Sequence, residues 1–148
     1  MLLAERLAAG NSGLKIDLIY GETEGSRIVE LQGVLPKKVK LHLVTEDGTV
    51  GARGKVTDVL AGLFASGRSP LALYTCGPKA MMAAVAGMAD LRQVALFEAS
   101  CEENMACGLG ICQGCVIPVK AGDGLTHYQR CCTEGPVFDG WEVNWQTG

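Results

Sequence analysis

The sequence predicts an α/β protein in which a parallel sheet flanked by helices is followed by a small cysteine-rich unit. Strand-like and helix-like segments alternate over residues 1–100, which is typical of a parallel sheet with helices on its faces. Helical periodicity then stops, and glycine and cysteine become frequent. We therefore place a boundary between residues 98 and 103 and divide the chain into residues 1–100 and 101–148.

The first segments are two strands and two short helical stretches. Residues 1–13 include an acid and an arginine within an apolar run, which predicts an amphipathic helix rather than a signal peptide. Residues 14–21, LKIDLIYG, predict a strand because β-branched and aromatic residues precede a glycine. Residues 27–35 predict a helical stretch closed by a proline. Residues 39–48 alternate in polarity up to an Asp-Gly turn, which predicts a second strand.

A second set of segments repeats the alternation. Residues 56–67 have apolar residues at helical spacing and a terminal glycine, which predicts a helix. Residues 70–77 form a continuous apolar run, typical of a strand buried on both faces. Residues 78–90 open with proline and are rich in alanine and methionine, which predicts a helix. Residues 92–100 predict another strand.

The region after residue 100 contains only short strand candidates, GCVIPVK, THYQRC and WEVNW. The unit predicted at residues 101–148 is too small to gain much stability from a hydrophobic core alone. An internal cross-link such as a metal centre would therefore help it fold.

Composition excludes several classes of function. The formal net charge is −3 in 148 residues, which argues against a nucleic-acid partner because such proteins usually present a basic face. The sequence contains no apolar run long enough to predict a membrane-spanning helix. We expect a reducing, cytoplasmic location, where seven cysteines do not form a disulfide framework.

The cysteines predict a metal centre. Cys107, Cys112 and Cys115 have the spacing C-x4-C-x2-C, and a further thiol follows at Cys131 or Cys132, which is the plant-type [2Fe–2S] pattern. Glycines within this stretch let the backbone wrap closely, so that N–H groups can hydrogen-bond the sulfurs of a cluster. A zinc site, which more often uses two C-x2-C pairs, and fortuitous free thiols are the alternatives.

Spacing does not choose between Cys131 and Cys132. Adjacent residues of an extended segment point to opposite sides, so we expect only one of them to face the cluster. Cys101 lies outside the pattern and is expected to be a small buried hydrophobic residue.

Two stretches carry a family resemblance. MACGLGICQGC, followed by CCTEGPVFDGWEV, resembles the electron-transfer subunit of NAD-dependent dihydroorotate dehydrogenase. LYTCGPKAMMAAV resembles the nicotinamide-binding half of the ferredoxin reductase superfamily, to which that subunit belongs. In the family the last ligand precedes a polar pair and then G-P-V-F, so the resemblance assigns Cys132 as the fourth ligand.

The resemblance implies a ferredoxin-reductase-type, Rossmann-like domain followed by a [2Fe–2S] subdomain. It covers only the last part of the family's architecture, since nothing here matches a flavin-binding barrel or the first strand and glycine-rich loop of the nucleotide domain. No G-x-G-x-x-G occurs. We therefore expect a fragment or a shortened form in which the family's FAD and NAD bind weakly or are absent.

Candidate nucleotide contacts follow two predicted strands. Cys76, Gly77 and Pro78 stand where a buried strand meets a helix, a place where parallel sheets bind ligands and where a helix N-terminus favours phosphate. An ordinary strand-to-helix turn is the alternative. Glu22 and Thr23 follow the strand 14–21 and are candidates for the adenosine end, with a solvated loop as the alternative.

The resemblance implies an electron-transfer subunit that is not catalytically complete by itself. It would pass electrons between NAD(H) and FAD and an FMN-containing dihydroorotate dehydrogenase subunit, or a similar flavoprotein, in pyrimidine biosynthesis. We expect Glu102, Glu103 and Asp123 to place negative charge near the cluster. The alternatives are a reductase subunit of a hydrogenase, sulfide dehydrogenase or glutamate synthase complex, a zinc-binding interaction module, and a domain that has lost its cofactors.

Overall fold

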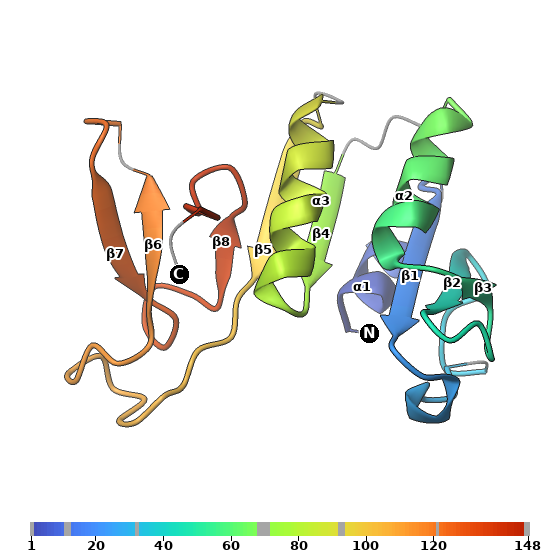
Figure 1. The fold of residues 1–148 in the computed structure, drawn as a ribbon, viewed down its shortest axis with the longest axis horizontal. Helices are drawn as coiled ribbons and strands as arrows, with labels where there is room; N and C mark the ends of the chain where they lie inside the picture. Colours follow the sequence, from blue (N-terminus) through green and yellow to red (C-terminus); the bar gives the residue numbers. More distant parts are fainter. Residues whose placement is uncertain are drawn as a thin grey trace. The chain divides into compact units, whose positions relative to one another are not determined.

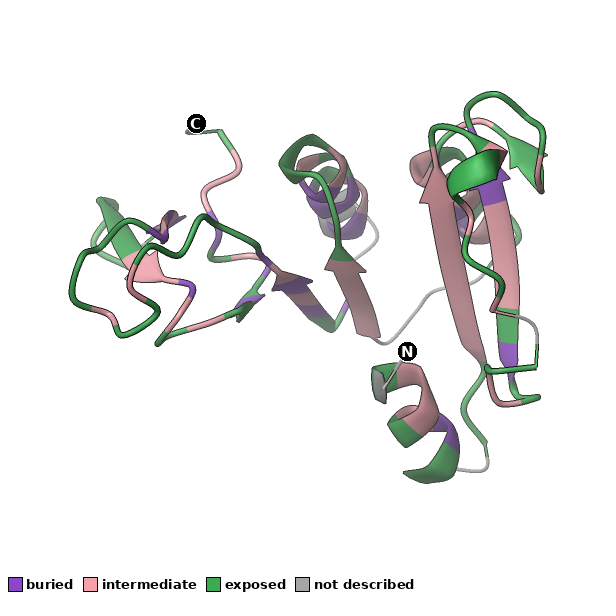
Figure 2. Cartoon of the chain, turned by 90° about the horizontal axis from the view of Figure 1, so that it is seen from below, coloured by how far each residue is buried: buried purple, intermediate pink, exposed green. Residues whose placement is uncertain are grey.

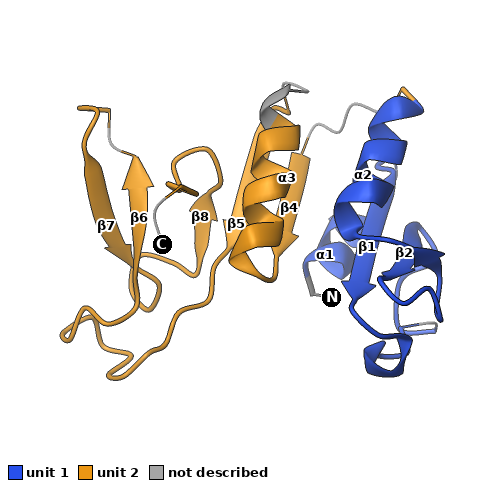
Figure 3. Cartoon of the chain, in the orientation of Figure 1, with its two compact units in different colours: residues 1–66 blue, residues 67–148 orange. Residues whose placement is uncertain are grey.

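The chain forms two compact units, residues 1–66 and 67–148, which Figure 3 distinguishes by colour. The computed structural model describes residues 2–10, 13–31, 33–67, 72–91, 94–120 and 122–146. None of the helices in these ranges has the length and apolar character that a membrane span requires.

The first unit is built on a three-stranded parallel sheet in the order β1-β2-β3. The strands are β1 (Ile16–Glu22), β2 (Val39–Thr45) and β3 (Ala52–Arg53). Parallel pairing joins Ile16 to Val39 and Glu22 to Thr45, so β1 and β2 end at the same edge. The strands predicted at 14–21 and 39–48 are confirmed, and β3 adds a short strand that the sequence did not indicate.

Two helices accompany this sheet, α1 (Leu2–Gly10) and α2 (Val56–Ala65). Both contact β1, and α2 also contacts β2 (Figure 1). The start of α2 is fixed by Asp58, whose Oδ2 accepts a hydrogen bond from the Lys55 N–H at 2.8 Å. Gly67 follows the helix at φ +80°, a left-handed conformation that favours glycine. Both predicted helices are confirmed.

The helical stretch predicted for residues 27–35 is wrong. In the described residues 27–31 and 33–35, helical structure is limited to the end of a short 3₁₀ turn, η1 (Gly25–Arg27). A helix this short depends on packing an apolar face, because its first turn is costly to form. Val29 and Val34 are instead exposed, with 63% and 53% of their surface in solvent. Gly33 adopts φ +83°, which no right-handed helix contains.

The second unit opens with a strand–helix–strand arrangement. β4 (Ala72–Cys76) and β5 (Leu96–Ser100) pair in parallel, and α3 (Lys79–Leu91) connects them and contacts both (Figure 1). These elements confirm the strand, helix and strand predicted between residues 70 and 100, although residues 68–71, 92 and 93 lie outside the described part of the chain. A further strand, β8 (Val137–Asp139), pairs antiparallel with β5 and was not predicted.

A hairpin completes the unit. β6 (Val116–Lys120) and β7 (Thr126–Arg130) pair antiparallel, with Val116 opposite Arg130 and Lys120 opposite Thr126. The third candidate strand, residues 141–145, is wrong as a strand. The Trp141 N–H donates to Asp139 Oδ1 at 2.8 Å and turns the chain, so that only Val143 pairs, in an isolated bridge with Val119.

A hydrophobic core lies within the second unit, and Figure 2 colours the buried residues purple. Its buried members are Met82, Ala99, Cys101, Cys115, Ile117, Val119, Cys131, Phe138 and Val143. Residues from both sides of the boundary predicted near residue 100 therefore share a core, while the compact units divide between Ser66 and Gly67. The division into residues 1–100 and 101–148 stays a prediction about domain organisation.

Candidate metal centre in the cysteine loop

The stretch 107–115, here called the cysteine loop, joins β5 to β6 without helix or strand structure. Three of its residues adopt left-handed backbone conformations: Gly108 at φ +64°, Gly110 at φ +77° and Gln113 at φ +53°. These conformations curl the chain, and glycine allows two of them without steric cost. The curled backbone turns its N–H groups toward the cysteine sulfurs.

Hydrogen bonds to sulfur confirm this orientation. The N–H groups of Leu109 and Cys112 donate to Cys107 Sγ at 3.4 and 3.5 Å, and the Gly114 N–H donates to Cys112 Sγ at 3.4 Å. The N–H of Cys112, followed by that of Leu109, lowers the pKa of the Cys107 thiol to about 6. A lowered pKa favours the thiolate, which is the form that binds metals.

A second pair of thiols forms where the chain leaves β7. The Cys132 thiol hydrogen-bonds the Cys115 sulfur, and this contact together with burial raises the pKa of Cys132. The Gly110 N–H also hydrogen-bonds the Cys132 sulfur and acts in the opposite direction. The apex of the cysteine loop therefore reaches Cys132, which lies far from it in sequence.

Cys131 has different surroundings from Cys132. Its side chain is only 1% exposed and belongs to the hydrophobic core, and burial is the main cause that raises its pKa to about 11. Cys132 is partly exposed and packs at the edge of that core. Cys101 is buried, as the sequence indicated.

The thiols stand as two neighbouring pairs, Cys107 with Cys112 and Cys115 with Cys132. All seven cysteines are free thiols. In the part of the chain that the structure describes, no three His, Cys, Asp or Glu side chains gather closely enough to hold a metal ion. The convergence of all four sulfurs on one centre therefore stays a prediction.

The donor set nevertheless fits an iron–sulfur cluster chemically. The candidate ligands are four thiols, which are the ligands such clusters use. Backbone N–H groups already point at three of the sulfurs, those of Cys107, Cys112 and Cys132. Such donors disperse the negative charge that a thiolate-bound cluster brings.

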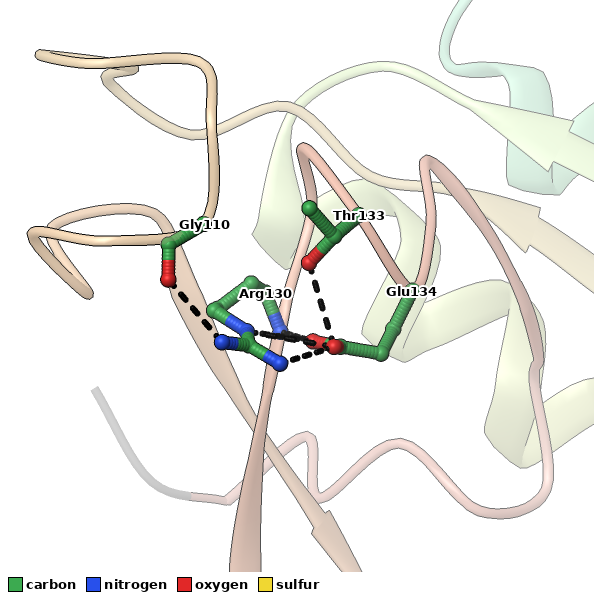
Figure 4. Close-up of polar contacts among 4 residues, drawn as sticks. All are labelled: Gly110, Arg130, Thr133 and Glu134. Carbon is green, nitrogen blue, oxygen red and sulfur yellow. Dashed lines mark hydrogen bonds and ion pairs between the residues drawn. The ribbon is translucent and has the colours of Figure 1, made fainter.

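Arg130, which the sequence did not indicate as a site residue, links the loop to the turn that holds Cys132 (Figure 4). Arg130 Nη1 donates to the Gly110 carbonyl at 2.9 Å, and Arg130 Nε donates to Glu134 Oε2 at 2.9 Å. Arg130 Nη2 completes an ion pair with the same carboxylate. This pairing, with help from the Arg130 backbone N–H, lowers the pKa of Glu134 to about 2. Opposite charges on both sides of the Cys-Cys pair in RCCTE were the only available signal.

The expectation that Asp123 adds charge near the loop is wrong. Asp123 lies in the turn that closes the β6–β7 hairpin, where its Oδ2 is 3.0 Å from His127 Nε2. Antiparallel pairing places Val116 and Arg130 at the opposite end of the hairpin, beside the loop. Glu102 and Glu103 are exposed and lie in the segment between β5 and the loop.

The candidate nucleotide residues fall in both units. Cys76 ends β4 and is exposed, Gly77 follows at φ +143°, and the Pro78 carbonyl accepts the first hydrogen bonds of α3. Glu22 ends β1 in the first unit, and its carbonyl accepts from the Glu46 N–H at 3.2 Å. These positions match the predicted strand ends, and their contact with a nucleotide stays a prediction.

A cavity of about 50 Å³ adjoins the turn at Gly77. Lys79, Cys101, Ile117 and Trp145 are among its lining residues. Ligand pockets are usually several times larger, on the order of 300 Å³ or more. In its present shape the cavity is therefore too small for a nicotinamide ring.

The fold and the loop together define a class of protein in which a thiol-rich loop, chemically suited to an iron–sulfur cluster, follows an α/β unit. A solved structure of NADH-dependent reduced ferredoxin–NADP oxidoreductase has this fold, with a TM-score of 0.75 at 24% identity. The match covers 97% of this chain and 48% of that chain. The predicted reductase-type fold class is thereby confirmed.

Residues 102–144 match the iron–sulfur cluster binding domain of dihydroorotate dehydrogenase B. Electron transfer subunits of dihydroorotate dehydrogenase B (NAD(+)) are similar over a longer stretch. Those of Listeria welshimeri and Bacillus caldolyticus are 41% and 42% identical over 104 and 102 residues, which is 70% and 69% of this chain and 38% and 37% of theirs. That of Enterococcus faecalis is 32% identical over 131 residues, 81% of this chain and 49% of its own.

The chain thus spans less than half the length of these curated relatives. Over the part that aligns, the resemblance to electron-transfer subunits of NAD-dependent dihydroorotate dehydrogenase is confirmed.

Proposed function

We propose that the chain is the iron–sulfur part of an electron-transfer subunit that serves dihydroorotate oxidation in pyrimidine biosynthesis. One observation carries the proposal: backbone N–H groups converge on thiol sulfurs within the very residues, 102–144, that match a cluster-binding domain. When bound, a [2Fe–2S] cluster accepts and donates single electrons, so it links two-electron carriers such as nicotinamides and flavins.

The ligands in this proposal are Cys107, Cys112, Cys115 and Cys132. Gly110 connects the two thiol pairs, because it belongs to the loop that holds Cys107 and Cys112 and its N–H meets the Cys132 sulfur. Cys131 is excluded from the set because its side chain points into the core. The protein's own contribution is to present thiolates, direct N–H dipoles at them and exclude water from Cys115, which is 2% exposed.

A flavoprotein is the proposed partner, with the FMN-containing catalytic subunit of dihydroorotate dehydrogenase as the specific candidate. Leu109 and Ile111, on the cysteine loop, are 72% and 78% exposed. Apolar side chains on the loop that holds the cluster ligands supply a surface on which a partner can exclude water along the electron path. A cytoplasmic location is part of the same proposal, because reduced thiols are required for cluster assembly.

FAD and NAD belong to the proposal as the cofactors of the full-length family. Cys76, Gly77, Pro78 and Glu22 are the residues proposed to meet the nucleotide. Their support is their place at the carboxyl ends of parallel strands, where open α/β sheets bind ligands.

The test is anaerobic reconstitution of the full chain with iron and sulfide, followed by metal analysis and electron paramagnetic resonance of the reduced sample. We expect iron and acid-labile sulfide in equal amounts and a signal from a reduced [2Fe–2S] centre. Zinc without sulfide would instead identify a structural metal module. Co-purification with a hydrogenase or a glutamate synthase would place the same module in a different complex.

Serine substitutions test the ligand set. Cys132→Ser is expected to change the resonance spectrum or abolish the cluster, whereas Cys131→Ser is expected to leave the spectrum intact. Cys131→Ser buries a hydroxyl in an apolar core, so it should lower the free energy of unfolding by roughly 1–3 kcal/mol. Cys76→Ser, at an exposed thiol outside the loop, is the control. The opposite pattern for Cys131 and Cys132 would reverse the assignment.

A further inference from the structure

Arg130 bridges two segments that are distant in sequence. It is the last residue of β7, directly before the turn that holds Cys131 and Cys132. One edge of its guanidinium holds Glu134 through Nε and Nη2, and Nη1 holds the carbonyl oxygen of Gly110 (Figure 4). Thr133 Oγ1 also donates to Glu134 Oε1 at 3.1 Å, so the carboxylate is held from two sides.

The Gly110 carbonyl that Arg130 holds lies between the residues whose N–H groups donate to the Cys107 sulfur. Leu109 precedes Gly110 and Cys112 follows Ile111, and the N–H groups of Leu109 and Cys112 both donate to Cys107 Sγ. The Ile111 N–H shares a trans peptide group with the Gly110 carbonyl, so it points the opposite way, toward the same sulfur. Fixing this one carbonyl therefore fixes the direction of the neighbouring N–H donors.

We propose that Arg130 is a positioning residue for the metal centre: by clamping the Gly110 carbonyl to the Glu134 carboxylate, it aims the N–H groups of the cysteine loop at the Cys107 sulfur. This inference rests on the proposed function, since it concerns the cluster that these thiols would hold. Glu134 also balances the charge of Arg130, because the two side chains form an ion pair. Arg130 therefore acts mainly through geometry rather than through a net charge beside the loop.

The consequence is electrochemical. Reduction adds one electron to a cluster, and hydrogen bonds to its sulfurs stabilise the added negative charge. Loss of the clamp should misdirect those donors and shift the midpoint potential to more negative values. A lysine cannot replace the arginine, because its single ammonium lacks the planar fork that reaches both partners.

The experiment compares the full chain with Arg130→Ala, Arg130→Lys and a matched control, Lys120→Ala. Lys120 is an exposed cation at the opposite end of the same hairpin. Redox titrations of reconstituted protein, monitored by electron paramagnetic resonance, give the midpoint potential. We expect both Arg130 variants to favour the oxidised centre by about tenfold at a given potential, which is about 59 mV for a one-electron couple. Lys120→Ala should leave the potential unchanged.

A wild-type potential in Arg130→Ala would overturn the inference. A wild-type potential in Arg130→Lys alone would also overturn it, because charge and not positioning would then be the cause. Should Arg130→Ala fail to hold a cluster, amide hydrogen exchange of the full apoprotein decides the question. Faster exchange at Leu109 and Cys112, with unchanged exchange within the hairpin, supports the positioning role. Unchanged exchange at Leu109 and Cys112 overturns it. If the wild-type chain takes up no cluster, the proposed function fails, while the exchange measurement still decides the role of Arg130.

Discussion

Cys131 and Cys132 are neighbours in sequence, yet their side chains enter different surroundings. The first completes a hydrophobic core, whereas the second meets Cys115 and the Gly110 N–H. The pKa of both thiols is raised, but for different main reasons: burial for Cys131 and the hydrogen bond to the Cys115 sulfur for Cys132. The candidate role of each cysteine therefore depends on the surroundings that its sulfur enters.

Asp47 supports a pH-dependent prediction at the scale of one side chain. The N–H and hydroxyl of Thr49 donate to Asp47 Oδ1 at 3.0 and 2.9 Å, and the Gly25 N–H donates to Oδ2 at 3.2 Å. The Thr49 N–H is the main cause that lowers the pKa of Asp47 from 3.8 to about 2. A carboxyl whose pKa falls on folding stabilises the native state above its unfolded pKa and ceases to do so as pH falls through the native pKa.

We therefore expect Asp47→Asn to lower the free energy of unfolding at pH 7. The difference from wild type should shrink as pH falls below 3.8 and vanish below about 2. Urea unfolding across this range measures it, with Glu46→Gln, at the neighbouring exposed carboxylate, as the control. A difference that stays constant with pH would contradict this origin.

At the scale of elements, the cysteine loop and the turn after β7 act as one structure because they approach closely at Gly110. A Cβ built on Gly110 would lie 2.8 Å from Thr133 Cγ2, closer than side-chain carbons normally come. Gly108 also has a positive φ, but a Cβ there meets nothing within 4 Å. A comparison of alanine at Gly108 and at Gly110 therefore separates the cost of backbone strain from the cost of a steric clash.

Gly110→Ala should therefore weaken the metal centre more than Gly108→Ala. Both substitutions impose a left-handed conformation on alanine, at a cost of about 1–2 kcal/mol each. Only Gly110→Ala also pushes the loop away from Cys132. Iron retained per chain after reconstitution measures the effect, and equal retention in the two variants would show that the close approach is unimportant.

At the scale of the whole molecule, the candidate centre belongs to the second compact unit. The cysteine loop, the hairpin and the core beneath them all lie within residues 67–148. The first unit has its own parallel sheet, in which Val44 is 1% exposed. A core substitution in the first unit should therefore affect the metal centre less than a core substitution in the second unit.

The matched substitutions are Val44→Ala in the first unit and Val119→Ala, at a buried valine of β6, in the second. Each removes two buried methyl groups and should destabilise its own unit by roughly 1–3 kcal/mol. We expect Val44→Ala to leave the resonance spectrum and the thermal loss of the cluster unchanged. Val119→Ala should lower the temperature at which the cluster is lost. Equal effects on the cluster would show that the two units respond as one.

The strands and helices with clear periodicity or a sharp local signal were predictable. The run LYTC lies within β4, and the segment PKAMMAAVAGMADL contains α3. The prediction for residues 27–35 was wrong because Val29 and Val34 stay exposed, and a short helix does not form without packing an apolar face. β8 was missed because VFD becomes a strand only where β5 offers an edge to pair with.

The sequence by itself determined the α/β alternation, the spacing of the thiols and the glycines that curl the loop, because these depend on local propensity and backbone freedom. Only the tertiary structure decided that Cys131 is buried, that Asp123 lies far from the loop and that Arg130 clasps Gly110. Those outcomes depend on strand pairing, which brings residues together across long separations and is set by the packing of a whole core.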